Sequence, residues 1–407
     1  MKKRIGVLGA GSAGVLTLSH LCSQLSNDWD IVSLYDPAIP ILGIGESTNP
    51  GFIALLERGT RFNLLEDTDQ LDSTLKFGTK YINWRDRDWL NPLLQGGTAV
   101  HFNNFKLKEF VFERLKFFWP QKFSVIEGTV TNLINTTDKV VVEINNSTEE
   151  FDYIVDCRGF PTDYNKDYHI SNCSILNRCL VHSFEKFDPI QYTEHIATKN
   201  GWMFGIPLTS RKTYGYLFND TITCIEDAKA DMAELLKIPV DGLALTEYKF
   251  KSYYTTKLVD NRIIKNGNRA IFFEPISATS INHYTNVCTI LFKYVTEQCS
   301  QDQANAEQIA LAQDLERIIN YIYHGGSTFD TEFWQQAAQN AKTNLVDDLD
   351  FKKIMLYNQR AYSMGLPGNG KPIVFSAQSL FMVDEFFGYN YFKGSPFLFD
   401  DFFNNFE

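Results

Sequence analysis

The sequence predicts an α/β protein built on a dinucleotide-binding module, with a β-rich middle and a helical C-terminal part. Three observations support this fold class. The chain opens with a strand-like run, a glycine-rich turn and a helical pattern in succession. Aromatic residues alternate along strand-like runs between about residues 180 and 265, and helical periodicity dominates after residue 300. A strand, turn, helix and strand in this order are typical of nucleotide-binding sheets.

We expect three regions, because 407 residues exceed what one hydrophobic core normally supports. Residues 1–180 and 265–300 are expected to form a discontinuous dinucleotide-binding module, 181–264 a β-rich region facing cofactor and substrate, and 301–407 a helical region. The run NAEQIALAQDLERIINYIY has helical spacing, and a second helix is predicted over 331–343. The aromatic tail, with FFGYNYF and FLFDDFFNNF, is expected either to cover the substrate pocket or to pack into a neighbouring subunit of a homo-oligomer.

Charge and cysteine content exclude several functional classes. A formal net charge of −11 repels phosphates, so we expect no nucleic-acid partner. The seven cysteines lack paired spacing, which predicts reduced thiols and no metal site. No run approaches the roughly 18 consecutive apolar residues of a membrane span, so we expect no membrane partner. These features together predict a cytoplasmic protein.

The opening motif is the strongest local signal. The turn consists of Gly9, Ala10, Gly11, Ser12, Ala13 and Gly14. Gly9 would permit a tight turn, Gly11 would let the backbone approach a pyrophosphate, and Gly14 would let the helix pack closely with its positive end facing the phosphates. Asp36 ends the next apolar run about 22 positions after Gly14, where a carboxylate typically binds a ribose hydroxyl. The motif alone leaves NAD and FAD open.

Two later segments favour FAD. FDYIVDCRGF, with a strand ending at Asp156, is similar to an element that flavoproteins place beside the first nucleotide-binding unit. In NGNRAIFFEPISATSI, Gly267 and Asn268 stand where flavin hydroxylases usually have Gly-Asp against the ribityl chain. Asparagine can still hydrogen-bond a hydroxyl. A proline-containing turn and a helix are predicted to follow.

Five segments together resemble the flavin-dependent halogenases, the group typified by the tryptophan halogenases. They are GAGSAG, GIGESTNP at 43–50, STLKFGTKYINW at 73–84, WMFGIP at 202–207 and, as a weaker match, NRAIFFEPISATSI. The resemblance implies an enzyme that uses FADH2 from a separate flavin reductase to make hypohalous acid from O2 and halide, and then halogenates an aromatic ring. The Asn- and Phe-rich composition is compatible with a phage-encoded member, which would work in the host cytoplasm.

The resemblance assigns the central role to Lys76. The matching lysine of the family presents hypohalous acid to the substrate, either through a hydrogen bond or as a haloamine. Only the haloamine requires a neutral amine, and therefore a pKa lowered by burial. The small and apolar neighbours of Lys76 favour a buried amine, although most lysines are exposed.

The loop GIGESTNP, which contains Gly45, Glu46, Ser47 and Thr48, straps over the flavin in the family. Its hydroxyl groups would hydrogen-bond the cofactor. The same residues are also compatible with an ordinary loop and a helix N-cap.

The strand with Trp202, Phe204 and Pro207 matches the family pattern Trp-x-Trp-x-Ile-Pro, with Phe204 in place of the second Trp. In the family these rings lie along the flavin and separate it from the substrate, a task that suits large rigid rings. Core packing in a hairpin produces the same alternation.

The clearest departure from the family is Ser277, which replaces a carboxylate that faces the catalytic lysine. A hydroxyl stabilises a cationic ring intermediate poorly, so the change favours a phenolic or otherwise electron-rich substrate over an indole. Halide is implied at the backbone amides of Thr279 and Ser280, which do not depend on the lost side chain. His101, a lone histidine in an aromatic strand, is predicted to be structural.

Two other functions remain open. A flavin-dependent aromatic monooxygenase would also lack a second dinucleotide fingerprint. A non-catalytic flavin-binding relative would explain the changes at Ser277 and Phe204. The sequence leaves the substrate, the preferred halide and the oligomeric state undetermined.

Overall fold

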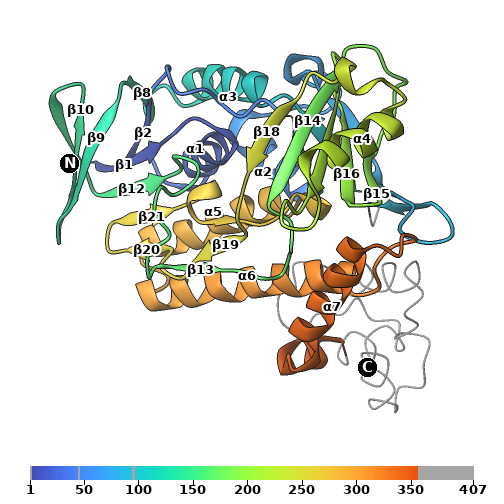
Figure 1. Cartoon of the computed structure of the whole chain (residues 1–407). Helices are drawn as coiled ribbons and strands as arrows, with labels where there is room; N and C mark the ends of the chain where they lie inside the picture. The colour runs from blue at the N-terminus through green and yellow to red at the C-terminus, as the bar shows by residue number, and fades with distance from the viewer. Residues whose placement is uncertain (1, 45, 94–96, 356–407) are drawn as a thin grey trace, which may run out of the picture.

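The structure is a computed structural model that describes residues 2–44, 46–93 and 97–355. It confirms the α/β fold class. Figure 1 shows two sheets side by side, with a layer of helices between and below them. Gly45 and the aromatic tail, for which we made predictions, lie outside the described residues.

The first sheet has six strands and contains the N-terminus. In spatial order these are β20 (Val259–Asp260), β21 (Ile263–Lys265), β12 (Tyr153–Asp156), β1 (Lys3–Leu8), β2 (Trp29–Tyr35) and β8 (Phe123–Glu127). All neighbouring pairs are parallel except β20 with β21. The central strand β1 is buried over its last four residues, because helices and a small sheet cover its two faces. The predicted strands at the opening motif, at Asp36 and at Asp156 are therefore confirmed.

The second sheet has seven strands and forms the β-rich middle. In spatial order these are β18 (Thr246–Lys249), β14 (Arg178–Phe184), β17 (Lys212–Phe218), β16 (Gly201–Pro207), β15 (Thr193–Thr198), β5 (Gly78–Ile82) and β6 (Trp89–Pro92). The hairpin of β16 and β17 brings Phe204 opposite Gly215. The parallel pairing of β15 with β5 joins segments far apart in the chain and aligns His195 with Tyr81.

Three small sheets connect and flank these two. They are β3 (Glu46–Ser47), β7 (Ala99–Phe102) and β4 (Thr74–Lys76); β11 (Ser147–Phe151), β10 (Val140–Ile144) and β9 (Val130–Asn135); and β13 (Tyr168–Ile170), β19 (Tyr253–Thr255) and β22 (Ile271–Phe272). The first matters most for function, because it pairs the loop of Glu46 and Ser47 with β7. That loop therefore contains a short strand.

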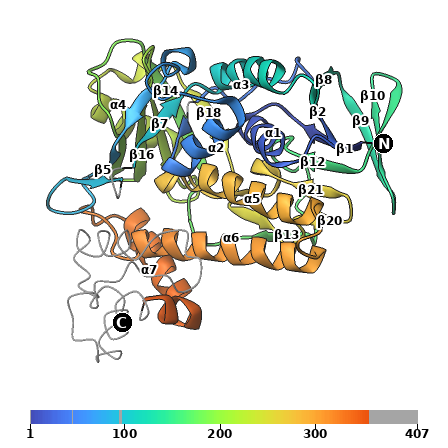
Figure 2. The same cartoon turned by 180° about the vertical axis from the view of Figure 1, so that it is seen from behind.

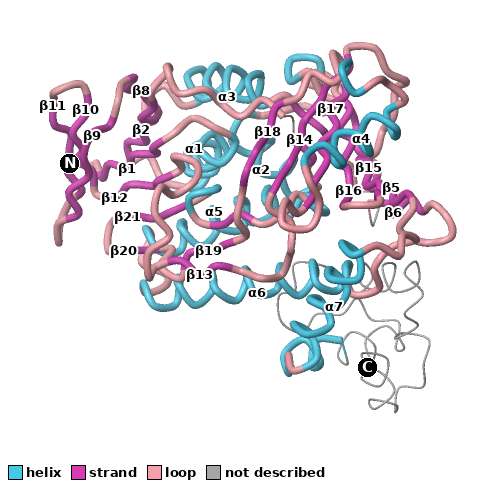
Figure 3. Tube along the Cα trace, in the orientation of Figure 1, coloured by secondary structure: helices cyan, strands magenta, loops and turns pink. Residues whose placement is uncertain are grey.

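The helices lie between the sheets and along one side of the molecule. They are α1 (Ser12–Gln24), α2 (Pro50–Thr60), α3 (Asn104–Phe118), α4 (Ile225–Leu236), α5 (Thr279–Val295), α6 (Gln301–Tyr323) and α7 (Glu332–Val346). Figures 2 and 3 show α6 running beneath both sheets and α7 at its end, below the larger sheet. Both predicted C-terminal helices are confirmed, with α6 started by a capping box at Ser300 and Gln303.

One helix of the middle region was not predicted. Helix α4 packs on the outer face of β17, and its buried residues include Ala228 and Met232. Two acidic residues in its first turn stabilise the helix, because their negative charge lies near the positive end of the helix dipole. Of the helices in the described ranges, none is both long and apolar enough to cross a membrane.

Candidate active site

A cleft lies at the carboxyl ends of β1 and β2, where the glycine-rich turn meets α1. Gly9 has φ +96°, and a Cβ there would lie 2.8 Å from a backbone oxygen of Cys157. A Cβ on Gly14 would lie 2.0 Å from the Gly9 carbonyl, so only glycine lets α1 begin this close to β1. By contrast, nothing lies within 4 Å of a Cβ on Gly11, which lines the cleft. The cleft thus has the shape and the helix N-terminus that a pyrophosphate needs.

Asp36 stands directly after β2 in the wall of the cleft. Its carboxylate accepts hydrogen bonds from the Thr129 hydroxyl and the Ala38 backbone, which lower the pKa of Asp36. An ionised carboxylate at this position suits a ribose hydroxyl.

Asp156 is directed at arginine side chains rather than into the cleft. Its carboxylate bonds Arg158 at 2.8 and 2.9 Å and lies 3.2 Å from Nε of Arg269. Burial alone would raise the pKa of Asp156, but the two arginines outweigh it and lower the pKa. Arg158 itself lines the cleft, so Asp156 acts on the cleft through that side chain.

Gly267 and Asn268 have different roles: Gly267 packs against α1, and Asn268 lines the cleft. Gly267 has φ +67°, and a Cβ there would lie 2.4 Å from Ala13 of α1, which explains the glycine. Asn268 lines the cleft, and its Oδ1 accepts a 2.5 Å hydrogen bond from the Tyr284 hydroxyl. The amide group of Asn268 is thus held in place at the cleft wall.

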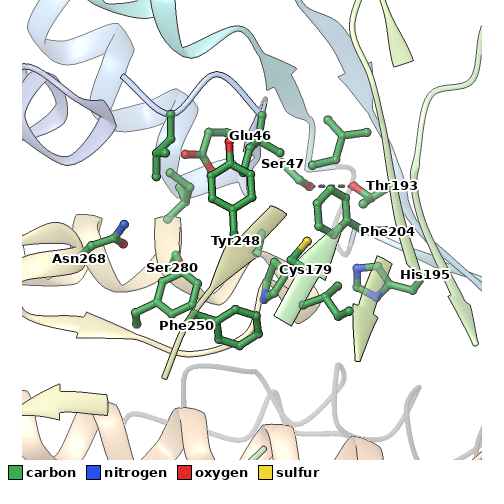
Figure 4. Close-up of a pocket in the computed structure, with 18 of the residues that line it drawn as sticks. Glu46, Ser47, Cys179, Thr193, His195, Phe204, Tyr248, Phe250, Asn268 and Ser280 are labelled. Atoms are coloured by element: carbon green, nitrogen blue, oxygen red, sulfur yellow. Dashed lines mark hydrogen bonds between the residues drawn. The ribbon is translucent and has the colours of Figure 1, made fainter. Parts of the chain in front are cut away.

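A second cavity adjoins the cleft and shares four of its lining residues. They are Leu42, Glu46, Asn268 and Tyr284. Its other walls come mainly from apolar and aromatic side chains of the large sheet, including Leu217, Phe204 and Tyr248. Phe250, which directly follows β18, also lines the cavity, and Figure 4 shows it with Phe204 and Tyr248. A mostly apolar cavity with a few polar groups is typical of a site for an organic ligand.

Lys76, at the end of β4, lines this second cavity and is only 3% exposed. Its Nζ donates to the Ser47 hydroxyl at 2.8 Å and to the Thr48 carbonyl at 2.9 Å. No carboxylate among the described residues lies within ion-pair distance of it. Burial lowers the pKa of Lys76 to about 7, so the neutral amine is accessible near neutral pH.

Ser47 begins a chain of hydrogen bonds that leads away from Lys76. The hydroxyl groups of Ser47 and Thr193 lie 2.7 Å apart (Figure 4). Thr193 Oγ1 lies 2.9 Å from Nε2 of His101. Thr193 is on β15 of the large sheet, whereas Ser47 and His101 are on β3 and β7 of one small sheet, so the chain of hydrogen bonds joins two sheets. It fixes the loop of Ser47 against the lysine.

The far end of this chain determines its direction. Thr74 Oγ1 donates to the Pro207 carbonyl at 2.7 Å, so it accepts from Nδ1 of His101, 2.9 Å away. Nε2 of His101 then carries no proton and accepts from Thr193, which in turn accepts from Ser47. Burial, with a smaller contribution from Lys76, holds the pKa of His101 well below its usual value, so the ring is neutral. The expectation that His101 is a structural residue agrees with these two bonds.

Two other residues of the predicted loop have distinct positions. The carboxyl of Glu46 faces the boundary between cleft and cavity, where Oε1 accepts from Asn104 at 2.9 Å and from Ser12 at 3.4 Å. Burial outweighs these bonds and raises the pKa of Glu46 to about 7. The Thr48 hydroxyl instead donates to the Val100 carbonyl at 2.6 Å, so this side chain is turned toward β7 and away from both cavities.

Of the three predicted residues on β16, only Phe204 lines the cavity. Trp202 is fully buried behind it and contacts Trp84 and His195. Pro207 takes part through its carbonyl, the acceptor for Thr74. The core-packing interpretation therefore applies to Trp202, whereas Phe204 forms a wall.

The segment before α5 is bent sharply. Ser277 and Ala278 both have φ +56°, which is strained for residues other than glycine. The Ser277 hydroxyl lies 3.1 Å from the Tyr81 hydroxyl, and the Thr279 hydroxyl donates to the Glu274 carbonyl at 3.1 Å. Ala278 and Ser280 line the cavity, so the N-terminus of α5 opens onto it. This arrangement suits an anion.

Sequence reasoning missed several residues that the fold brings to the cleft and the cavity. Thr193 and His195 lie on β15, outside every motif that we recognised, whereas Asn104 and Tyr284 come from two helices. The strand sequence TEHIAT gives no functional signal. The parallel register of β15 with β5 brings Thr193 and His195 to the cavity that Lys76 lines.

The fold and the site define a nucleotide-binding α/β protein: a cleft at the ends of parallel strands, adjoined by an apolar cavity with a buried lysine. Comparison with known proteins narrows this class. The family described as tryptophan halogenase matches residues 4–124 and 98–387 of the chain. The chain therefore belongs to the tryptophan halogenase family.

Individual relatives are distant but match along most of their length. The tryptophan 6-halogenase ThaL of Streptomyces albogriseolus is 22% identical, over 90% of this chain and 83% of its own. The tryptophan 7-halogenase RebH of Lentzea aerocolonigenes is 20% identical, over 87% of this chain and 81% of its own. The crystal structure of the tryptophan halogenase from Shewanella frigidimarina superposes with a TM-score of 0.78 at 17% identity, covering 99% of this chain and 93% of that one.

Proposed function

We propose that this protein is an FADH2-dependent halogenase that makes hypohalous acid from O2 and halide and uses it to halogenate an electron-rich, phenolic or indolic, ring. The observation that carries the proposal is the buried Nζ of Lys76, which lines an apolar cavity beside the nucleotide cleft. Reduced flavin would supply the reducing equivalents that activate oxygen for halide oxidation. A separate flavin reductase would deliver it.

The residues present fit this cofactor. The nucleotide part would lie along Gly9 to Gly14, with a ribose on Asp36 and the ribityl chain near Gly267 and Asn268. Asp156 would contribute by holding Arg158 in the cleft. The flavin ring would lie near the shared wall, against Glu46, Ser47 and the backbone of Thr48, with the β16 residues Trp202, Phe204 and Pro207 behind it.

Within the second cavity, the residues would divide the remaining tasks. Backbone N–H groups of Thr279 and Ser280, at the positive end of α5, would hold halide. Lys76 would orient hypohalous acid by donating a hydrogen bond while the ring of the substrate rests on the aromatic walls. With Ser277 in place of the family carboxylate, a phenol, which activates its own ring, is the favoured acceptor.

The test compares two buried lysines. Lys122 is 5% exposed and donates to the carbonyls of Cys22 and Leu25, but it lines neither cavity. Purified wild type, Lys76→Met and Lys122→Met are supplied with an unrelated flavin reductase, FAD, NADH, oxygen, bromide and a panel of phenols and indoles. We expect brominated product from wild type and Lys122→Met, and a loss of roughly 10²-fold or more in Lys76→Met.

Product mass distinguishes the rival functions. A gain of oxygen in place of bromine would identify a monooxygenase. Flavin binding without consumption of oxygen beyond the flavin-only background would identify a non-catalytic protein. Full halogenation by Lys76→Met would overturn the assigned role of the lysine.

A further inference from the structure

The second cavity lacks an obvious acceptor for the proton that an aromatic ring loses when it is substituted. Among its described lining residues, the single carboxylate is Glu46, and that group is held at the boundary with the cleft by Asn104 and Ser12. Ser277, at the position where the family resemblance implies a carboxylate, offers a hydroxyl that is paired with Tyr81. The amine of Lys76 lines the cavity but is assigned to hypohalous acid. A separate proton acceptor must therefore be sought among the other lining residues.

His195 is the one imidazole among the described lining residues. It is 2% exposed and lies in the middle of β15, paired with Tyr81 of β5 on one side and Phe204 of β16 on the other. Figure 4 shows its ring at the edge of the cavity beside Phe204. The ring of His195 packs perpendicular to Tyr81, with centroids 5.1 Å apart, and so lies next to the residue that bonds Ser277.

The backbone carbonyl of His195 accepts from the Trp84 indole at 3.0 Å, but the fold does not use the ring in this way. Its buried Nδ1 has no hydrogen-bond partner among the described residues. Buried polar groups nearly always have a partner, because an unpaired one costs about 1–3 kcal/mol. The contrast with His101 is direct, since both nitrogens of that ring are bonded. An unpaired imidazole in a cavity wall indicates a group kept for a ligand.

We propose that His195 accepts the ring proton of the aromatic substrate during halogenation, a role that Ser277 cannot fill. The inference rests on the proposed function. In the first step a C–X bond forms as the X–O bond of hypohalous acid breaks, and hydroxide leaves. In the second, the ring C–H bond breaks, its electron pair restores aromaticity, and the proton moves to the imidazole. Transfer of that proton to hydroxide gives water and restores neutral His195.

The surroundings keep His195 in the required form. Burial, assisted by the charge of Lys76, lowers the pKa of His195 to about 3, so the ring is unprotonated at neutral pH. A cationic ring intermediate is a far stronger acid than an imidazolium, so even this weak base can accept its proton. The same burial and the same lysine make the imidazolium short-lived, which favours return of the proton to hydroxide.

The principal test is a kinetic isotope effect with a ring-deuterated phenol, measured in wild type, His195→Gln and His195→Leu. His182→Gln is the matched control, because His182 is a buried histidine of the same sheet that does not line the cavity. We expect isotope effects near unity in wild type and His182→Gln. Both His195 variants should lose roughly 10²-fold in rate and show a clear primary isotope effect, because loss of the proton becomes rate-limiting.

A second measurement needs neither turnover nor flavin. Binding of the phenol to flavin-free wild type is expected to shift the imidazole NMR resonances of His195 and to leave those of His182 unchanged. The affinity of flavin-free His195→Gln for the phenol should stay within about twofold of wild type, since the ring contributes little uniform binding.

The outcomes separate this inference from the proposed function. Halogenation by His195→Gln at the wild-type rate without an isotope effect would overturn the role of His195 and leave the halogenase intact. An unshifted His195 resonance at saturating phenol would do the same even if the variants failed to fold. If the wild-type protein gave no halogenated product, both the proposed halogenase function and the role of His195 would be contradicted.

Discussion

At the scale of single residues, Thr193 holds the loop of Ser47 and Lys76 together. Its hydroxyl accepts from Ser47 and donates to Nε2 of His101, and it has no role in any local motif. Replacing it by valine keeps the shape of the side chain and removes both bonds. The effect on function should therefore come from the position of the amine.

We predict that Thr193→Val lowers the free energy of unfolding by about 1–3 kcal/mol, because it leaves the buried Nε2 of His101 unpaired and removes the acceptor of the half-buried Ser47 hydroxyl. Halogenation should fall more than stability explains, since the Ser47 hydroxyl that accepts from Nζ of Lys76 is no longer held in place. Thr198→Val is the control on the same strand: Thr198 is 1% exposed and donates to the Tyr216 hydroxyl, outside both cavities. Equal activity losses in the two variants, measured at matched folded fraction, would contradict the prediction.

Residue identity could be predicted from the sequence where a motif imposes it. Lys76 and Ser47 were found because their neighbours match a family pattern, and Gly9 and Gly14 because only glycine fits those turns. His195 could not be found in this way. Its function depends on the register between strands more than 100 residues apart, and no local spacing encodes that register.

At the scale of elements, the start of α5 stores backbone strain beside the cavity. Ser277 and Ala278 adopt left-handed conformations in succession, at a cost of about 1 kcal/mol or more each. The bend aims the first N–H groups of α5 at the space lined by Ser280. Strain at this position is consistent with a preorganised anion site.

We predict that Ala278→Gly stabilises the protein by about 0.5–1 kcal/mol and lowers halogenation, because the relaxed bend no longer fixes the N-terminus of α5. Lys237→Gly is the control. Lys237 has φ +56° at the end of α4, is exposed, and lines neither cavity. The melting temperature should rise in both variants, and halogenation should fall in Ala278→Gly alone. A fully active Ala278→Gly enzyme would show that the strain has no role in catalysis.

Elements with strong local signals were predicted correctly, and those with weak ones were not. The hairpin of β16 and β17 has clear alternation and a turn, and α6 has helical spacing and a capping box. Helix α4 was missed because it interrupts a region dominated by strands. The strand β3 was missed because two residues give no period to detect.

At the scale of the whole molecule, buried histidines should control stability in acid. Five of them have lowered pKa values: His20, His101, His195, His283 and His324. Burial is the main cause, with values of about 4 for His20 and His283 and about 3 for His195 and His324. Between the usual value of 6.5 and these values, the unfolded chain binds protons that the native protein does not. Stability therefore falls as the pH drops below 6.5.

Four carboxyl groups act in the opposite direction. Burial raises the pKa of Glu46 and Glu274 to about 7 and also raises the pKa of Asp314 and Glu316, so the native protein keeps protons that the unfolded chain loses. Five histidines outnumber four carboxyl groups, so Tm is expected to fall from pH 6.5 to 4.5. His20→Phe should reduce this slope, since His20 already packs on Phe292 as an apolar ring does. A Tm that stays constant or rises toward pH 4.5 would contradict the linkage.

The edge strand β18 forms a wall of the second cavity whose residues can be substituted without altering the residues around Lys76. β18 pairs with β14 alone, and its Tyr248 and the following Phe250 line the cavity at the side away from Lys76's own small sheet. Substitutions there alter the size and shape of the space offered to an acceptor without touching the residues that anchor the amine. Natural or laboratory evolution can therefore change which aromatic acceptor fits by substituting this one peripheral segment. Such substitutions leave Lys76 and its hydrogen-bond partners in place.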